Sequence, residues 1–465
     1  MTLRCRTAWP VGLGLALASQ WLGGCRHDDD GGAAQGESTG SDDGADSTTG
    51  DPAAPSYWQD AAPILFEHCG QCHRDGGIAP FVIDDYAQAA AWAEASAMAV
   101  SERTMPPWLV TDDGSCGEFR DSRALSQADI DTLVAWAAAG APEGTPRDDL
   151  QQTAPPSLAQ AIDLDTPAFV PVAEGTPWAE ADEYRCFVVD AGADVDRVIT
   201  AYEVVPGNDA LTHHVLLFDL DPTLEVGPGQ TNADVIAALD AESPDRDGWP
   251  CFGASGDGTA PSGVPVAWAP GQGVMRFPDG VGYPLASGTM LVAQVHYNLA
   301  AADDEVEPFT TRVRLQTRDT VERPLVANLI DPFLGTLASP TPASLAPGEA
   351  AVQYSWQASV AELAGPVAGL DVYGVLPHMH ARGVSQRFDV VHADGSRTCG
   401  LDVPRWDIAW QLFHFFQQPL RLQPDDVVEV TCTYDTRDAS EPVMPGWGSS
   451  SEMCLLGVYA APVLP

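Results

Sequence analysis

The stretch RVITAYEVVPGNDALTHHVLLFDL, residues 197–220, decides the fold class of most of this chain. Two runs rich in β-branched and aromatic residues flank a short segment with Pro, Gly, Asn and Asp, a pattern typical of two strands joined by a turn. Similar runs recur between Gly, Pro and Asp turns at 185–189, 290–297, 311–317, 385–392 and 427–434. Long helical periods are scarce in this part of the chain, so we predict antiparallel sheets packed as sandwiches.

The length of 465 residues is too great for one ordinary hydrophobic core and favours about three domains. We therefore expect a multidomain chain. The predicted parts are a small all-α domain at 57–145, a linker at 146–170, and two all-β sandwiches of jelly-roll type at 171–318 and 319–465.

The chain is strongly acidic. It has 66 Asp and Glu residues against 22 basic residues, all of them Arg, and a formal net charge of −44. No basic stripe is present to neutralise phosphates, so binding to nucleic acid is not expected. Docking of the folded body on an anionic membrane surface is disfavoured for the same reason. The lack of Lys also excludes Schiff-base chemistry.

The N-terminus has the features of an export signal. Arg4 and Arg6 precede an apolar run at 11–19 that is too short to span a bilayer. The run ends in LGGC at residues 22–25, which resembles a bacterial lipobox and implies removal of residues 1–24 and lipid attachment to Cys25. Ordinary signal cleavage is the alternative. We predict an exported protein, periplasmic or at the cell surface, that meets a membrane only through this anchor.

Residues 25–56 are rich in Asp, Gly, Ser and Thr and have almost no apolar residue. Such a segment cannot bury enough surface to fold, so we predict a disordered acidic linker.

The motif Cys69-Gly70-Gln71-Cys72-His73 is typical of covalent c-type haem attachment, with the histidine as an iron ligand. A redox dithiol or half of a zinc site would explain the two thiols but not the histidine that follows them.

Met105, in the Pro-rich loop RTMPPW at 103–108, is the predicted second axial ligand of this haem. Met98 is the competing candidate, but its mid-helix position predicts packing in the core. Residues 58–144 resemble small bacterial cytochrome c domains, in which a Met-Pro-Pro-Trp loop supplies that ligand.

Six further cysteines remain after Cys5, Cys25 and the haem motif are set aside: Cys116, Cys186, Cys251, Cys399, Cys432 and Cys454. An even number in an exported protein predicts up to three disulfides, and the spacing alone does not choose among the pairings.

Five histidines fall in three short motifs: His213-His214, Gln294-Val295-His296-Tyr297 and His378-Met379-His380. In a strand, residues two apart share a face, so His378 and His380 can grip one metal ion. Adjacent residues point to opposite faces, so His213 and His214 can share an ion only if the strand twists or bulges, or if they use different ring nitrogens. A packed or hydrogen-bonded histidine is the ordinary alternative at each position.

Together with Glu452-Met453-Cys454, these motifs resemble, in this order, the copper type II, ascorbate-dependent monooxygenases, a family of two facing β-sandwiches. The resemblance covers residues 180 to 462. It implies one copper ion at His213, His214 and His296, and a second, catalytic one at His378, His380 and Met453. It also implies a disulfide between Cys432 and Cys454. The residue types agree independently, because a His2Met set favours copper over zinc or magnesium.

The resemblance implies an enzyme that hydroxylates a C–H bond of a small molecule with O2. Ascorbate or a reduced redox protein would supply electrons, and the fused haem offers a further source. Peptide-amidating relatives hold a carboxylate with an Arg where this chain has Leu376, and a Tyr where it has Gly457. A neutral or cationic substrate is therefore predicted. The alternatives are a non-catalytic electron-transfer lipoprotein and a metal-binding, lectin-like sandwich.

Overall fold

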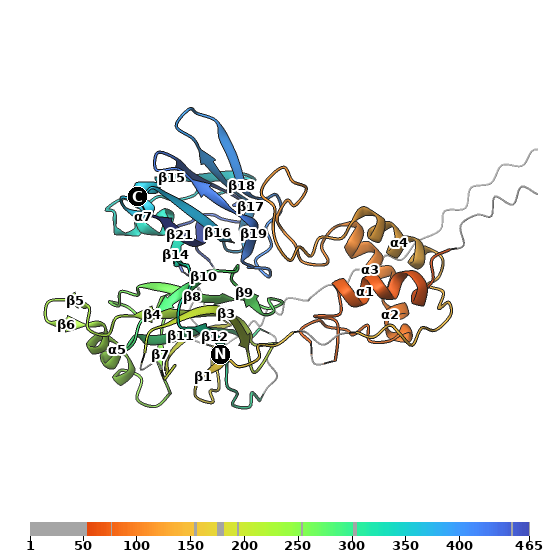
Figure 1. The fold of residues 1–465 in the computed structure, drawn as a ribbon, viewed down its shortest axis with the longest axis horizontal. Coiled ribbons are helices and arrows are strands. Elements are labelled where there is room, and N and C mark those ends of the chain that lie inside the picture. Colours follow the sequence, from red (N-terminus) through yellow and green to blue (C-terminus); the bar gives the residue numbers. More distant parts are fainter. Residues whose placement is uncertain are drawn as a thin grey trace, which may run out of the picture. The chain divides into compact units, whose positions relative to one another are not determined.

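The computed structural model describes residues 54–464, with gaps at 76, 153–155, 174–180, 193–194, 253, 301–304 and 448–449. The predicted signal peptide, the lipidation of Cys25 and nearly all of the predicted acidic linker lie outside the described residues. Within the described part of the chain, strands predominate and form several sheets, which confirms the prediction of a mainly β protein (Figure 1). None of the helices described there is long and apolar enough to cross a membrane.

An N-terminal helical module precedes the sheets. Its helices are η1 (Tyr57–Ala61), α1 (Ala62–His68), α2 (Tyr86–Ala91), α3 (Ala93–Ser101) and α4 (Gln127–Ala138). Their shared core includes Tyr57, Leu65, Leu133 and Trp136, all almost fully buried. The module therefore has an apolar core of its own.

The Ala-rich sequence after Asp84 predicts a second helix of this module that is capped by Asp84 and runs to about Arg103, and the structure corrects this prediction in two respects. The cap is Asp85, which has an extended backbone. Its side chain accepts a hydrogen bond from the Gln88 backbone N–H, and the Gln88 side chain accepts one from the Asp85 backbone N–H. The helix also breaks at Trp92, which separates α2 from α3.

The first β region contains two sheets. One has the order β1 (Ile162–Asp165), β12 (Arg312–Arg318), β3 (Arg197–Val205), β10 (Val281–Leu285) and β13 (Arg323–Pro324), with β9 (Met275–Arg276) on β3. The other has the order β7 (Trp249–Pro250), β2 (Asp182–Val189), β11 (Met290–Asn298), β4 (Thr212–Leu220) and β8 (Gly263–Trp268). One apolar cluster unites residues from both sheets, among them Tyr202, Leu217 and Val295. Strands β5 (Glu225–Gly227) and β6 (Gln230–Thr231) and helix α5 (Asn232–Ala241) lie between β4 and β7.

The second β region also has two sheets. One has the order β14 (Val326–Ile330), β21 (Leu455–Val463), β16 (Gly369–His378) and β19 (His414–Leu422). The other has the order β15 (Val352–Ser359), β20 (Val427–Tyr434), β17 (Gly383–Val391) and β18 (Arg397–Val403). Val372 and Leu456 of the first sheet share a core with Phe388 and Val430 of the second. The short helices are α6 (Pro332–Gly335), η2 (Thr336–Ala338) and α7 (Val360–Ala364).

The chain passes from one β region to the other between β13 and β14. Strand β13 still pairs with β10, whereas β14 pairs with β21, so the crossover lies slightly beyond the predicted boundary at 318/319. At the other end, β1 pairs with β12 and lies inside the predicted linker at 146–170. The jelly-roll topology stays a prediction.

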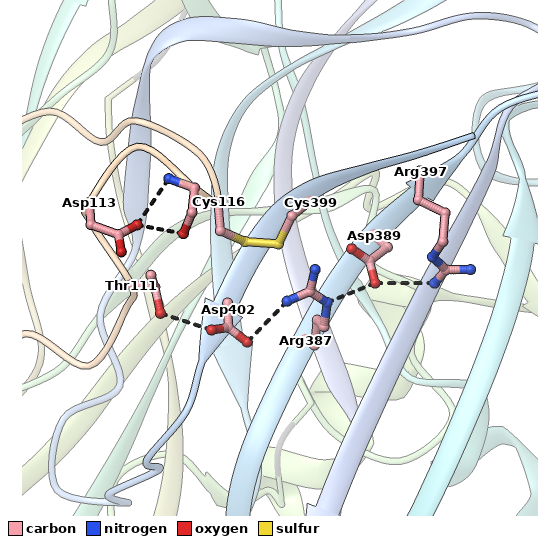
Figure 2. Close-up of a disulfide and its surroundings, with 9 residues drawn as sticks. Thr111, Asp113, Cys116, Arg387, Asp389, Arg397, Cys399 and Asp402 are labelled. Carbon is pink, nitrogen blue, oxygen red and sulfur yellow. Dashed lines mark hydrogen bonds and ion pairs between the residues drawn. A yellow bond between two sulfur atoms is a disulfide. The ribbon is translucent and has the colours of Figure 1, made fainter.

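The loop after α3 is attached to the second β region along residues 111–120. Thr111 donates its backbone N–H to the Asp402 carbonyl and its hydroxyl to the Asp402 carboxylate, at 2.8 Å each. Arg120 donates its backbone N–H to the Phe415 carbonyl at 2.7 Å. Figure 2 shows the disulfide between Cys116 and Cys399 beside the hydrogen bond from Thr111 to Asp402. The helical module is therefore covalently joined to a distant strand, at a sequence separation of 283.

Two further disulfides join Cys186 to Cys251 and Cys432 to Cys454. The expectation of disulfides among the six cysteines is confirmed, and the pairings that the spacing left open are now assigned.

Candidate metal centres

The first histidine set is His213, His214 and His296, on the neighbouring strands β4 and β11. His296 lies directly opposite His214 in the antiparallel register, but the next residue, Tyr297, lies opposite Thr212. The register therefore shifts, and His213 is the extra residue of a β-bulge. A bulge is one of the ways in which adjacent histidines were predicted to reach one point, and it turns both side chains toward His296.

The three imidazoles of this set converge through their Nδ1 atoms. The Nδ1 atom of His214 lies 3.5 Å from that of His213 and 3.3 Å from that of His296. A histidine nitrogen lies about 2.0–2.1 Å from a bound metal ion, which puts two nitrogens of a trigonal set about 3.5 Å apart. The set thus has the spacing of a preformed three-nitrogen metal site.

Asp182 at the start of β2 supports this arrangement. The His296 Nε2 atom donates to its carboxylate at 3.0 Å, and Asn298 donates to the same oxygen at 2.7 Å. The proton of His296 is thereby held on Nε2, which leaves Nδ1 free as a ligand. Burial lowers the pKa of His213 and, more strongly, those of His214 and His296, so all three rings stay in the neutral form that metals bind.

The second set, His378, His380 and Met453, is built where β16 and β21 meet. His378 pairs with Leu455 in the antiparallel register, and His380 and Met453 each lie two residues beyond this last pair, at the same end of the two strands. Tyr434 donates its hydroxyl to the Met453 carbonyl at 2.6 Å, and the disulfide from Cys454 to Cys432 ties the same loop to β20. The Met453 side chain is almost fully buried and is held by these two attachments of its backbone.

In the second set, the Nδ1 atoms of the two histidines form hydrogen bonds that hold the rings in place. The His378 Nδ1 donates to the Gln411 side-chain oxygen at 2.6 Å, and the His380 Nδ1 donates to the Ser451 carbonyl at 2.8 Å. Each ring is left with Nε2 as its ligand atom. Burial and the neighbouring His380 lower the pKa of His378 to about 3, so this imidazole is neutral.

Glu452 joins the two chain segments of this set. Its carboxylate accepts the backbone N–H groups of His380, at 2.9 Å, and Arg382, at 2.7 Å. It is fully buried, and burial raises its pKa to about 7. These two backbone hydrogen bonds are a structural reason for an acidic residue directly before Met453, because a buried carboxyl group needs donors.

Both sets line a single pocket of about 160 Å³. Its wall contains all six predicted ligand residues together with Asp182 and Gln411. The remaining wall is largely apolar, with Trp268, Leu329 and Leu376 among its members. The two sets therefore share one small pocket.

A larger cavity of about 980 Å³ lies at the helical module. Cys69, Cys72, His73 and Met105 all line it, and most of its other lining is apolar. The wall is completed by residues of both β regions, including Met275 and Phe413. The four predicted haem-binding residues are thus brought to one cavity of a size suited to a large flat cofactor.

The chemistry of the motif also fits a haem. Cys69 and Cys72 form no disulfide, and burial raises the pKa of Cys69 to about 12, whereas reactive dithiols have a lowered thiol pKa. His73 donates Nδ1–H to the Phe81 carbonyl at 3.1 Å, which leaves Nε2 free for iron.

Met98 is 60% exposed on α3 and does not line the cavity, so the prediction that it packs in the core is wrong. Its position on the outer face of α3 points the side chain to solvent. This leaves Met105 as the methionine of the module that lines the cavity among the described residues.

Sequence reasoning missed Asp182 and Gln411, which support one ligand of each set. Nothing near either residue in the sequence marks it, because each is distant from its histidine and meets it only through strand register or loop path. Gln294, two residues before His296, donates to the Ala254 carbonyl at 2.6 Å and also forms a side-chain hydrogen bond with His214.

Comparison with known proteins agrees with this arrangement. Residues 334–462 match the C-terminal domain of the copper type II, ascorbate-dependent monooxygenases. The second set lies entirely within this match. The family implies copper and ascorbate as cofactor and electron donor.

Relatives match a longer part of the chain than this domain. Tyramine beta-hydroxylase of Caenorhabditis briggsae is 24% identical over an alignment of 299 residues that covers 60% of this chain and 45% of that protein. Dopamine beta-hydroxylase of Homo sapiens is 26% identical over 326 residues, 66% of this chain and 47% of that protein. The rat enzyme (Rattus norvegicus) is 24% identical over 321 residues, again 66% and 47%. The matches span just under half the length of these relatives. A structure of the Gx strain of infectious bursal disease virus also matches, at 12% identity over 61% of this chain and 58% of that one, but its TM-score of 0.15 supports no argument.

Proposed function

We propose that this chain is a copper-dependent monooxygenase that hydroxylates a C–H bond of a small organic molecule with O2. The observation that carries the proposal is the shared pocket, which is lined by three converging imidazoles on one side and by two imidazoles with a buried thioether on the other. The family match and the hydroxylase relatives support the same conclusion.

In the proposed reaction, the copper ions and the protein side chains would have separate roles. Copper at both sets would supply two electrons and the activation of O2. The chain holds the ligand rings neutral and fixes their tautomers through Asp182, Gln411 and the Ser451 carbonyl. Its apolar pocket wall excludes water and orients the substrate between the two sets.

The pocket supports a neutral or cationic substrate. Leu376 lies directly opposite Gly457 on β16 and β21, and a side chain at Gly457 would collide with the Leu376 Cβ atom, 2.9 Å away. These are the two positions at which peptide-amidating relatives carry Arg and Tyr. Among the described residues that line the pocket, none is Arg or Lys. Because the relatives are named for tyramine and dopamine, aromatic amines are the first substrates to test.

The helical module would bring a covalent haem beside the second set. Trp410 and Leu412 line the haem cavity, whereas Gln411 between them lines the copper pocket and binds His378. One short segment therefore has the two sites on its opposite faces. It offers a covalent path for electrons from the haem, in place of ascorbate or beside it.

Export and lipid anchoring through Cys25 complete the proposal. Three disulfides support an oxidising compartment outside the cytoplasm. The anchored chain would face the periplasm or the cell surface. Mass spectrometry of the N-terminal peptide from membranes should show a diacylglyceryl group on Cys25, and an unmodified cysteine would refute the anchor.

Oxygen-dependent turnover tests the enzyme. The copper-loaded chain is incubated with phenolic amines, small amides and amino alcohols, with ascorbate or pre-reduced haem as donor, and products are analysed for one atom of labelled oxygen from O2. Incorporation supports the monooxygenase. Electron uptake without a hydroxylated product from any class would instead support the non-catalytic electron-transfer lipoprotein.

The haem path has its own test. After flash reduction, the haem should reoxidise rapidly only when copper is loaded. Identical kinetics in the copper-free chain would reject the path and leave the oxygen-incorporation result untouched.

A further inference from the structure

The loop 404–413, which joins β18 to β19, contacts both histidines of the second set. The Gln411 side-chain oxygen accepts the Nδ1 proton of His378 at 2.6 Å. The Trp406 indole N–H donates to the backbone carbonyl of His380 at 3.0 Å. Hydrogen bonds of this kind fix the orientation of metal ligands, and their loss lowers metal affinity or activity. The position of this loop therefore decides how both imidazoles are presented to a metal ion.

The Trp406 side chain is held against the turn that follows His380. It is 7% exposed, and its backbone N–H donates to the Val384 carbonyl at 2.8 Å. A Cβ atom on Gly383 would collide with the Trp406 ring, so the ring packs directly on the Gly383 backbone. Gly383 also donates its N–H to the His380 carbonyl, at 3.1 Å. Trp406 therefore cannot shift without disturbing the turn that carries His380.

Arg405, the neighbour of Trp406, joins the same loop to the helical module. Its guanidinium donates to the Glu102 carbonyl at 3.0 Å and to the Arg103 carbonyl at 2.5 Å. Both carbonyls lie just beyond the last turn of α3, which contains no basic residue of its own. The carbonyl end of a helix carries a partial negative charge and lacks partners within the helix, so a cation there is favourable. Arg405 supplies that cation from a distant loop.

The loop 404–413 also lies between the two cavities. Trp410 and Leu412 line the cavity at the helical module, whereas Ile408 and Gln411 line the pocket of the metal sets. The loop is thus in contact with the helical module on one side and with the second set on the other. A change in how the module sits on the loop would reach the second set through adjacent residues.

We propose that the second set takes up its working geometry only when the helical module is seated on the loop 404–413, with Arg405 and Trp406 as positioning residues. The inference rests on the copper ligands of the proposed function and does not require the haem. Without its contact to α3, Arg405 is released, and the adjacent Trp406 holds the His380 carbonyl less firmly. The place of oxygen chemistry is thereby made dependent on the module that is proposed to supply its electrons.

Variants of the full copper-loaded chain test the proposal through kcat, KM and the infrared stretch of carbon monoxide bound to the reduced second set. Trp406→Phe keeps the buried ring but deletes the N–H group that binds His380, so kcat should fall about 10-fold with little change in KM. Arg405→Gln alters no residue of the copper pocket, yet it should lower kcat in the same way by less. Both variants should shift the carbon monoxide stretch.

Arg405→Lys should recover part of the loss, because it keeps a cation at the end of α3. Arg147→Gln, at an exposed pair with Asp149, is the matched control and should leave kcat and the stretch unchanged. A lowered melting temperature in Trp406→Phe and Arg405→Gln, with kcat and the stretch as in the wild type, would mean that the contacts only stabilise the fold and would overturn the proposal.

The remaining outcomes separate the parts of the inference. A shift in Trp406→Phe alone would overturn the role of the helical module. A wild-type chain that binds no copper at the second set would overturn this inference together with the copper part of the proposed function. If Trp406→Phe fails to fold, Arg405→Gln, at an exposed position, decides by the same criterion.

Discussion

The two metal sets line one pocket but use opposite nitrogens of their histidines. In the first set the Nδ1 atoms converge at 3.3 and 3.5 Å, and the outer nitrogen of His296 is held by Asp182. In the second set the Nδ1 atoms of His378 and His380 are held from behind by Gln411 and a backbone carbonyl. Met453 completes the second set with a sulfur atom.

This difference suggests different tasks for the two sets. Three imidazole nitrogens at metal-ligand spacing form a closed, rigid set, which suits a metal that only stores and passes an electron. Two imidazoles and a weak thioether leave more room for another ligand and favour the reduced form of copper. The second set is therefore the expected place of oxygen chemistry.

Removing the thioether should have the largest effect. Met453→Leu keeps the volume of this buried side chain, so the fold should be retained, but it deletes the sulfur. We expect product formation to fall to background, while copper at the first set and its spectrum persist. Turnover and copper content per chain measure this outcome.

The matched control is Met444→Leu, an exposed methionine of the same segment, which should behave as the wild type. Normal turnover of Met453→Leu would remove the distinction between the two sets.

Deleting the central imidazole of the first set should separate oxygen chemistry from electron supply. His214→Ala removes the Nδ1 atom that lies next to the Nδ1 atoms of both His213 and His296. The copper ion of the first set, one of the two in each chain, should therefore be lost. Multiple turnover should fall sharply, yet the second set should still bind carbon monoxide when reduced. Infrared spectra of the carbonyl adduct provide the measurement, and loss of that signal would show that the sets do not act separately.

The ligands of both sets could be predicted from the sequence, whereas their supports could not. The strands follow from composition, the spacing of His378 and His380 marks them as a pair that can share an ion, and the resemblance to the copper family suggested the remaining candidate ligands, His296 and Met453 among them. The bulge at His213 is one of the arrangements that let two adjacent histidines share one ion, so it too could be anticipated. These features are local, or follow from a periodicity of two residues.

Long-range contacts were not predictable in the same way. Gln411 meets His378, and Cys116 meets Cys399, because of strand register and the path of a loop. Met98 was misjudged because a residue near the middle of a short helix can face either side, and here it faces solvent. The secondary-structure propensity of a residue does not indicate which distant residue it contacts in the folded chain.

The support behind His378 should matter less than a ligand but more than a surface residue. Gln411→Ala removes the acceptor of the His378 Nδ1 proton, so the ring is free to turn or change tautomer. Loss of such a partner costs about 10- to 100-fold in metal affinity or activity. Gln411→Glu keeps an acceptor and should recover most of the turnover, which a purely structural role would not explain.

Copper titration and kcat of both variants measure the effect. Gln353→Ala, an exposed glutamine of β15, is the control. Equal losses in Gln411→Ala and Gln411→Glu would contradict the positioning role.

The weakest of the four effects is expected at Asp182, the corresponding support of the first set. Asp182→Asn keeps an oxygen that can accept from the His296 Nε2 proton, so the tautomer survives, but the negative charge is lost. A less basic His296 should bind copper roughly tenfold more weakly. The reduction potential of this copper should rise, because the missing charge no longer stabilises the oxidised ion.

Asp190→Asn, an exposed carboxylate just beyond the same strand, should change neither the copper affinity nor the reduction potential. Since the second set takes its support from Gln411 and Ser451, its own potential should stay fixed in Asp182→Asn. A parallel shift at both sets would mean that the shared pocket, rather than each set's own hydrogen bonds, controls the metals.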